Sequence, residues 1–261
     1  YHSLRSRLDQ ELQSGAVRQA RESLRELWSL QPSSSTAAFI LSSRQTLAAQ
    51  ADLRRFRVAI LRSFTVEPVV PLLQASALLH GMDLEVHVGA FNAYAQEMLE
   101  PSAELRAFSP DIVILSVRTE DLLPQIWDQS ADLASEDVPR IIQNSLEHVR
   151  SWFQAFRHRC GAMLIVHSLE LPAMPAQGLL DHANLVGQAV AIMDFNRGLK
   201  TLAAQFRNIS VLDYDGLIAR YGREQWSDPV RWATIRLPIS AHCLRYLASE
   251  WLRHIYAMVG H

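Results

Sequence analysis

The sequence is poor in two residue types that would each point to a particular kind of site. Lys200 is its single lysine, so a phosphate-binding loop or a Schiff-base site would depend on that one residue. Its two cysteines, Cys160 and Cys243, lack the close spacing of a metal or redox motif, and the chain shows no secretory signal. We therefore expect reduced thiols in a cytoplasmic protein.

Long apolar runs and an excess of one charge are also missing. No apolar run approaches the ~20 residues that a membrane span needs. The net charge of −2 and the isoelectric point of about 6.6 indicate neither a nucleic-acid partner nor a membrane surface. Hydrophobic residues make up 49% of the 261 positions, which is enough to bury the core of one α/β domain with a small accessory piece.

Residues 3–49 have a helical pattern, because leucine and other apolar residues recur at helical spacing. The polar run at 31–36, QPSSST, interrupts the pattern and offers an N-cap for a further helix over about 36–49. We therefore expect a helical extension at 1–50, a candidate docking element, in front of an α/β domain at 55–261.

From Arg57 onward, short apolar strands alternate with helical stretches. The expected strands are Val58–Leu61, Asp83–Val88, Asp111–Val117, Ala162–His167 and Ile209–Leu212. The expected helices are 68–79, closed by Gly81, then a turn at 102–108, and 120–157, 183–206 and 240–257. This alternation predicts a three-layer α/β/α sandwich with about five parallel strands, of the SGNH or flavodoxin-like type.

Ligands bind at the carboxyl ends of the strands in such a sheet. Polar side chains occupy the turns that follow four of the predicted strands. These turns are Arg62–Thr65 (RSFT), Gly89–Asn92 (GAFN), Arg118–Asp121 (RTED) and His167–Glu170 (HSLE). We therefore expect the functional site to be assembled from these turns.

Four residues are candidates for catalysis. Ser63 and Thr65 lie in the first turn as candidate nucleophiles or substrate donors, or as caps of the following helix. His167 closes the fourth strand, where it is either a base or a hydrogen-bonded core residue. Asp228 lies between two tryptophans, where it either orients a histidine or caps a helix.

Five residues are candidates for substrate binding. Arg62 and Arg118 end adjacent strands, where they either bind a phosphorylated or carboxylated substrate or pair with nearby carboxylates such as Glu120. Asn92 and Gln96 follow the second strand in a polar loop, which is either a ligand contact or loop structure.

The order of these turns resembles the SGNH (GDSL-type) hydrolase fold. PDIVILSVRTEDLL resembles that family's third block, with RTED in place of Gly-x-Asn-Asp. Glu120 then stands at the oxyanion-hole asparagine, where a carboxylate would repel an oxyanion. Pro238 stands about where the triad histidine is expected. The resemblance therefore implies a degraded triad. The alternative is an SGNH-type esterase or O-acyltransferase that uses Ser63 with a relocated histidine, His167 or His242.

A closer resemblance is to the amino-terminal, SGNH-like domain of FkbH-like proteins. It covers about 57–250 through five stretches that occur in order: AILRSFTVEPVVPLL, VGAFNAYAQEMLEPSAELRAFSPDIVILSV, LIVHSLELP, VLDYDGLIARYG and WSDPVRWATIRLPIS. That family joins this domain to a carboxyl-terminal HAD-type phosphatase domain and is associated with polyketide assembly lines.

The FkbH resemblance implies a function and partners. It implies that the chain helps to load a glyceryl unit from 1,3-bisphosphoglycerate onto the phosphopantetheine thiol of an acyl carrier protein. The domain would hold no cofactor or metal of its own, and the HAD-type domain would act in cis or in trans. A non-catalytic carrier-protein docking domain is the other alternative.

The run VLDYDG resembles the start of a HAD phosphatase, but only 46 residues follow Asp215 and none is lysine. We therefore interpret Asp213 and Asp215 as a helix N-terminus, where carboxylates cap free amides. Phosphatase chemistry would then lie outside this chain.

Overall fold

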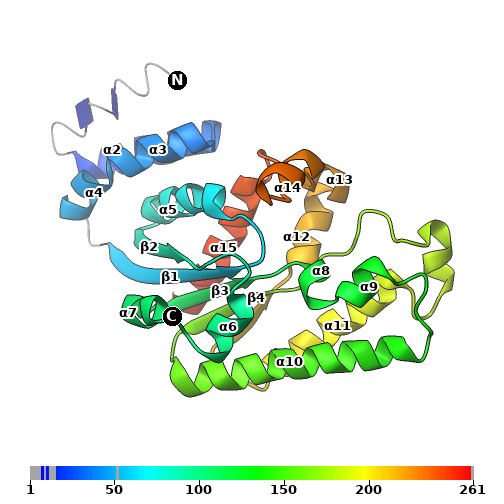
Figure 1. Ribbon diagram of the computed structural model, residues 1–261. Coiled ribbons are helices and arrows are strands. Elements are labelled where there is room, and N and C mark those ends of the chain that lie inside the picture. Colours follow the sequence, from blue (N-terminus) through cyan, green and yellow to red (C-terminus); the bar gives the residue numbers. More distant parts are fainter. Residues whose placement is uncertain (1–6, 9, 12–15, 51–52, 260–261) are drawn as a thin grey trace. The chain divides into compact units, whose positions relative to one another are not determined.

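The computed structural model describes residues 7–8, 10–11, 16–50 and 53–259 (Figure 1). The chain divides into two compact units. Unit 1 comprises Tyr1–Val58, Val66–Val86 and Ser240–His261, and unit 2 comprises Ala59–Thr65 and His87–Ile239. None of the described helices is long and apolar enough to cross a membrane.

The strands form one five-stranded sheet in the order β2-β1-β3-β4-β5. Their bounds are β1 Arg54–Arg62, β2 Met82–Val88, β3 Ile112–Ser116, β4 Met163–His167 and β5 Ile209–Leu212. β4 pairs in parallel with both neighbours, and Ile165 lies opposite Ile114 and Ser210. The predicted α/β fold with five parallel strands and flanking helices is confirmed. β1 begins earlier than predicted, since the Arg54 amide donates to the Gly81 carbonyl at 3.1 Å.

Unit 1 contains the amino-terminal helices and the closing helix. Its helices are α2 Val17–Leu30, α3 Ser34–Ser42, α4 Arg44–Gln50, η1 Glu67–Val69, α5 Val70–Leu79 and α15 Leu244–Val259. Ser33 caps α3 by accepting the Thr36 amide at 3.3 Å, as the polar run predicted. Residues 3–6, 9 and 12–15 of the predicted extension lie outside the described residues, and the predicted boundary near residue 50 stays a prediction.

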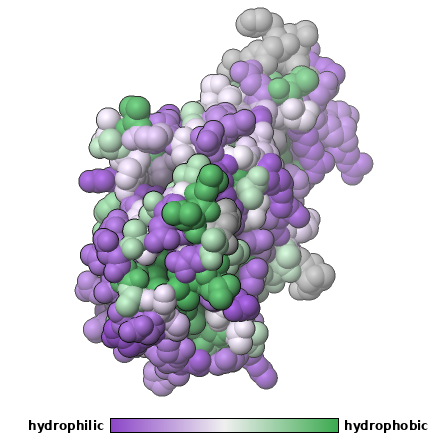
Figure 2. All heavy atoms as spheres, turned by 90° about the vertical axis from the view of Figure 1, so that its right-hand side faces the viewer, coloured by the Kyte–Doolittle hydropathy of each residue, from purple (hydrophilic) through white to green (hydrophobic). Residues whose placement is uncertain are grey.

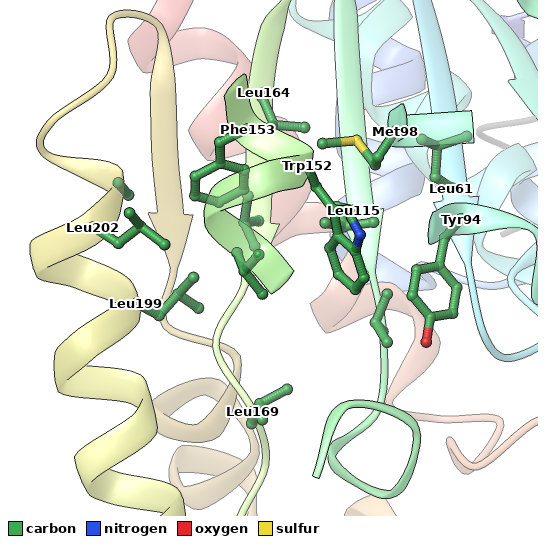
Figure 3. Packing of buried hydrophobic residues seen from close by; sticks show 14 of the residues in the cluster. Leu61, Tyr94, Met98, Leu115, Trp152, Phe153, Leu164, Leu169, Leu199 and Leu202 are labelled. Atoms are coloured by element: carbon green, nitrogen blue, oxygen red, sulfur yellow. The ribbon is translucent and has the colours of Figure 1, made fainter. Parts of the chain in front are cut away.

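Unit 2 contains the other helices. They are α6 Tyr94–Leu99, α7 Ala103–Phe108, α8 Thr119–Leu122, α9 Pro124–Asp128, α10 Asp137–Arg159, η2 Gly178–Ala183, α11 Gln188–Ala203, α12 Tyr214–Tyr221, α13 Arg223–Trp226 and α14 Pro229–Ile235. α10 and α11 are amphipathic and bury their apolar faces together with β3 and β4. Figure 3 shows Phe153 of α10 beside Leu164 of β4. This packing fixes the strands whose carboxyl ends carry the site.

Three predicted helices were wrong in extent. The helix over about 36–49 is instead α3 and α4, which are separated at Ser43. The single helix over 120–157 is instead α8, α9 and α10, interrupted near Pro124 and again over 129–136. The helix predicted from residue 183 begins at Gln188, because Asp181 accepts the amides of Gln188 at 2.7 Å and Ala189 at 3.1 Å. A cap from outside the helix leaves no local signal in the sequence.

Candidate functional site

The structure links all four predicted turns by direct hydrogen bonds. The Arg118 amide donates to Ser63 Oγ at 3.0 Å, and the Arg118 guanidinium donates from Nε to Glu170 Oε1 at 3.1 Å. The second turn joins the first, since the Asn92 amide donates to the Arg62 carbonyl at 3.1 Å. Parallel strands that end at one edge of a sheet explain this assembly.

Ser63 is buried, with 2% of its surface exposed. Its hydroxyl accepts the Arg118 amide and is hydrogen-bonded to the Asp121 carboxylate. Neither partner is an imidazole. The hydroxyl is therefore held by an amide and a carboxylate where an SGNH triad would place a histidine.

Thr65 links the first turn to the segment that contains α14. Its Oγ1 donates to the Ile235 carbonyl at 2.6 Å, and its amide donates to the Arg236 carbonyl at 2.8 Å. The one hydroxyl proton is thus bonded to a carbonyl. The N-cap of η1, Val66, has no side-chain cap, so the alternative capping role is not seen.

His167 and Asp228 both take part in local structure. His167 is buried, its Nδ1 lies 3.2 Å from Ser116 Oγ, and its ring stacks on Tyr214 at 4.6 Å between centroids. Asp228 Oδ1 accepts the Arg231 amide at 3.0 Å and caps α14. The structure thus gives Asp228 the second of its two predicted alternatives.

Arg118 is the centre of the assembled turns. Its guanidinium donates to Glu120 at 2.8 Å and to Glu170 at 3.1 Å. It also lies over the Trp232 ring at 4.2 Å and the Trp127 ring at 5.9 Å. The predicted ion pair with Glu120 is confirmed. Sequence reasoning did not select Glu170 as a site residue, although it ends the fourth turn, because its partner lies 52 positions away.

Arg62, Asn92 and Gln96 lie around the first two turns. Arg62 is buried and donates to the carbonyls of Gly89 at 3.3 Å and Phe64 at 3.4 Å. It therefore braces the two turns against each other. Asn92 is exposed with a left-handed backbone, φ 60°, and Gln96 is exposed on α6.

A pocket of about 150 Å³ opens beside Arg118. Its walls include Arg118, Glu170 and Arg223 together with the aromatic residues Trp127, Tyr214 and Trp226. The two arginines are already paired, Arg118 with two glutamates and Arg223 with Asp215 at 2.6 and 2.9 Å. The pocket therefore suits a small hydroxylated ligand, which uses hydrogen bonds and aromatic faces, better than a free anion.

In the HAD-like run, Asp213 caps a helix as predicted, whereas the predicted capping role of Asp215 is wrong, because Asp215 bonds to groups outside α12. Asp213 caps α12 by accepting the Gly216 amide at 3.3 Å. Asp215 accepts the Leu171 amide at 2.7 Å and binds Arg223 through both oxygens. These contacts tie α12 to the loop that follows β4.

That loop also carries an exposed apolar patch. Leu171, Pro172 and Ala173 line the pocket, and residues further along the loop are largely exposed: Met174, Leu179, Leu180 and Leu185. Figure 2, which views the molecule from the right-hand side of Figure 1, shows hydrophobic side chains gathered near the middle of that face. Patches of this kind typically mark interaction surfaces or ligand sites.

Three carboxyl groups around Arg118 should make stability depend on pH. Burial raises the pKa of Glu120, of Asp121 and of Glu170, and Arg118 opposes the rise in each case. A raised pKa in the folded state favours folding below the ordinary values of 4.5 and 3.8, and that contribution is lost as the pH rises through the raised pKa.

We therefore expect acidification from neutral pH towards the ordinary carboxyl value of 4.5 to raise the free energy of unfolding of the wild type relative to Glu170→Gln, which has no proton to take up at this position. Urea unfolding of both proteins over a pH series measures this. A difference in the free energy of unfolding between the two proteins that stays constant with pH would contradict the prediction.

Comparisons with known proteins agree with the fold. The sequence profile of the family described as FkbH, N-terminal domain, matches residues 57–255. No curated protein sequence matches the chain.

Several solved structures share the fold. The N-terminal part of the protein BF1531 from Bacteroides fragilis, which contains a phosphatase domain, is 17% identical with a TM-score of 0.68; the match covers 80% of this chain and 53% of that chain. The chain thus spans about half of that relative. The lipase Lip_vut3 from a goat rumen metagenome is 14% identical with a TM-score of 0.54, covering 79% and 97%. An acetyl xylan esterase variant from Geobacillus stearothermophilus is 14% identical with a TM-score of 0.50, covering 78% and 96%.

Proposed function

Because the chain belongs to the FkbH N-terminal domain family, we propose that it takes part in loading a glyceryl-type acyl unit onto an acyl carrier protein in polyketide biosynthesis. The acyl donor would be 1,3-bisphosphoglycerate, and the acceptor the phosphopantetheine thiol of the carrier. Attack of the thiol on the acyl carbon would release the phosphate of the acyl phosphate, and a HAD-type phosphatase domain, in cis or in trans, would hydrolyse the remaining phosphate. This chain spans about half of the BF1531 structure, and that structure contains a phosphatase domain. The comparison therefore supports a phosphatase domain separate from this chain.

The pocket beside Arg118 carries the proposal. Its 150 Å³ equals the share of about five water molecules at ~30 Å³ each, which suits a three-carbon acyl group with two hydroxyls. Glu170 and Ser227 on its wall can exchange hydrogen bonds with hydroxyls, and Tyr214 and Trp226 can pack against carbon. Because both arginines are neutralised, we infer that a phosphate group would be removed or would point out of the pocket.

The degraded triad fits a role in binding the acyl unit. Ser63 is bonded to Arg118 and Asp121, and Asp228 caps a helix. An acyl phosphate is also a more reactive donor than an ester, so its transfer to a thiol asks less of a general base. We therefore infer that the domain holds the acyl unit while the thiol of the carrier attacks it.

The test is to incubate the chain with 1,3-bisphosphoglycerate and a phosphopantetheinylated carrier protein, with and without a separate HAD-type domain. Intact-protein mass spectrometry of the carrier then detects a glyceryl or phosphoglyceryl adduct. We expect an adduct that depends on this chain. Ala173→Trp should abolish it, because the new indole fills the pocket without removing any contact.

Ala176→Trp is the matched control, since Ala176 is exposed in the same loop and is not part of the pocket wall. Loading that survives Ala173→Trp would contradict the pocket as the acyl site. A stable complex with the carrier but no adduct would favour a docking domain. Neither adduct nor complex would favour the SGNH-type esterase, to be tested with an ester panel on the wild type and on Ser63→Ala.

A further inference from the structure

The segment of residues 227–239 is an excursion closed at its base. Ser227 and Ile239 form an antiparallel bridge, and the Asp228 amide donates to the Pro238 carbonyl at 2.9 Å. Trp226, just before the excursion, and Ile239, its last residue, are buried. The base is therefore anchored in the core, while α14 lies beyond it.

α14 itself has no buried residue, and Val230 is 71% exposed. Its contacts with the rest of unit 2 include the two hydrogen bonds from Thr65 and the Trp232 ring over the Arg118 guanidinium. Arg231 Nη1 is buried without a hydrogen-bond partner, which destabilises the closed position of α14. A helix held by few contacts opens locally at a lower free energy than the core does.

The base of the excursion is also part of the pocket. Ser227 and Pro238 line the pocket, and so does Arg118, which Trp232 covers. Displacement of α14 would lift the Trp232 indole from Arg118, which lines the pocket, and would uncover the guanidinium. The chain turns back at Arg236, whose backbone is left-handed with φ 54°, an unfavourable conformation for a residue other than glycine.

We propose that α14 is a lid on the pocket beside Arg118 and that Thr65 is the positioning residue that latches it. The Thr65 hydroxyl then serves to hold Ile235 in the closed arrangement and is not a nucleophile. The inference goes beyond the proposed acyl loading, since it concerns access to the pocket whatever ligand the pocket takes.

Trypsin provides a direct readout, because Arg231 and Arg236 lie in the lid and at its end. Cleavage after these residues needs α14 to open, so its rate under native conditions reports the open population. Thr65→Val removes the hydroxyl donor and should raise the initial rate at both bonds about fivefold, the ratio that corresponds to one net hydrogen bond. Thr65→Ser keeps the donor and should cleave at the wild-type rate.

Three further measurements make the test specific. Trp232→Ala should likewise speed cleavage after Arg236, whereas Val230→Ala, at an exposed position of the same helix, should not. Cleavage after Arg159 at the end of α10 should be unchanged in Thr65→Val. An unchanged rate in the lid, or an equal acceleration after Arg159, would overturn the proposal. None of these readouts requires acyl loading, so failure of the proposed function would not be mistaken for failure of the lid.

Discussion

Replacing Arg118 by leucine is expected to lower the free energy of unfolding by about 3–5 kcal/mol, the usual effect of removing one partner of a buried ion pair. Glu170, which is 8% exposed, would lose its cation and keep the Thr119 amide at 3.3 Å and the Thr119 hydroxyl at 3.1 Å, a hydroxyl that it shares with its own carbonyl at 2.7 Å. Glu120 would lose the same partner, and Trp232 would lose the guanidinium beneath its ring. Urea unfolding with linear extrapolation measures the effect.

The double variant Arg118→Leu/Glu170→Leu tests the cause. If the effect comes from a buried carboxylate without a cation, removal of that carboxylate should restore part of the lost stability. Acidification should reduce the difference in the free energy of unfolding between Arg118→Leu and the wild type, because a protonated Glu170 is neutral and does not require a cation. A loss in Arg118→Leu below about 1 kcal/mol, which is typical of a surface pair, would show that the cluster is solvated and would contradict the prediction.

Trp226→Ala is expected to lower the free energy of unfolding by a similar amount, about 3–5 kcal/mol, because it removes a large side chain from the core. Trp226 is 2% exposed, its Nε1 donates to the Tyr214 hydroxyl at 3.3 Å, and it packs edge-on against that ring at 5.9 Å. It also stacks on Tyr221 at 6.4 Å. Its loss would therefore remove one wall of the pocket together with the support of α12.

Trp226→Phe separates packing from hydrogen bonding. Phenylalanine keeps an aromatic ring but has no N–H donor, so we expect a much smaller loss than in Trp226→Ala, near the ~1 kcal/mol of one hydrogen bond plus some packing. Thermal and urea unfolding of the three proteins provide the comparison. Equal losses in the two variants would show that the indole N–H, and not the volume of the ring, supports this wall.

The two variants also bear on the acyl site. Arg118 and Trp226 line the same pocket, and each is held by a partner from another segment: Glu170 for the first and Tyr214 of α12 for the second. A site built from such mutually dependent side chains is rigid before the ligand arrives. Preorganisation of this kind lowers the entropic penalty of binding.

The pattern of apolar residues was enough to predict the fold class and the edge of the sheet at which the candidate site lies. β5 covers the predicted residues, and the other strands agree with the pattern to within a few positions. The closing helix was also predicted, over 240–257, and α15 spans Leu244–Val259 with Leu247, Trp251 and Ile255 buried. These features could be predicted because the period of apolar residues is repeated within each element and is therefore local.

The roles of the polar residues at that edge could not be predicted, because they depend on tertiary contacts. Thr65 was predicted as a nucleophile, donor or cap, yet its hydroxyl is bonded to a carbonyl 170 positions away. Asp181, outside α11, sets where that helix begins, and Glu170 shares Arg118 with Glu120. A hydroxyl or a carboxylate has the same chemistry as a nucleophile, a cap or an ion-pair partner. Its role depends on which donor packing brings within about 3 Å, and no local pattern records that distance.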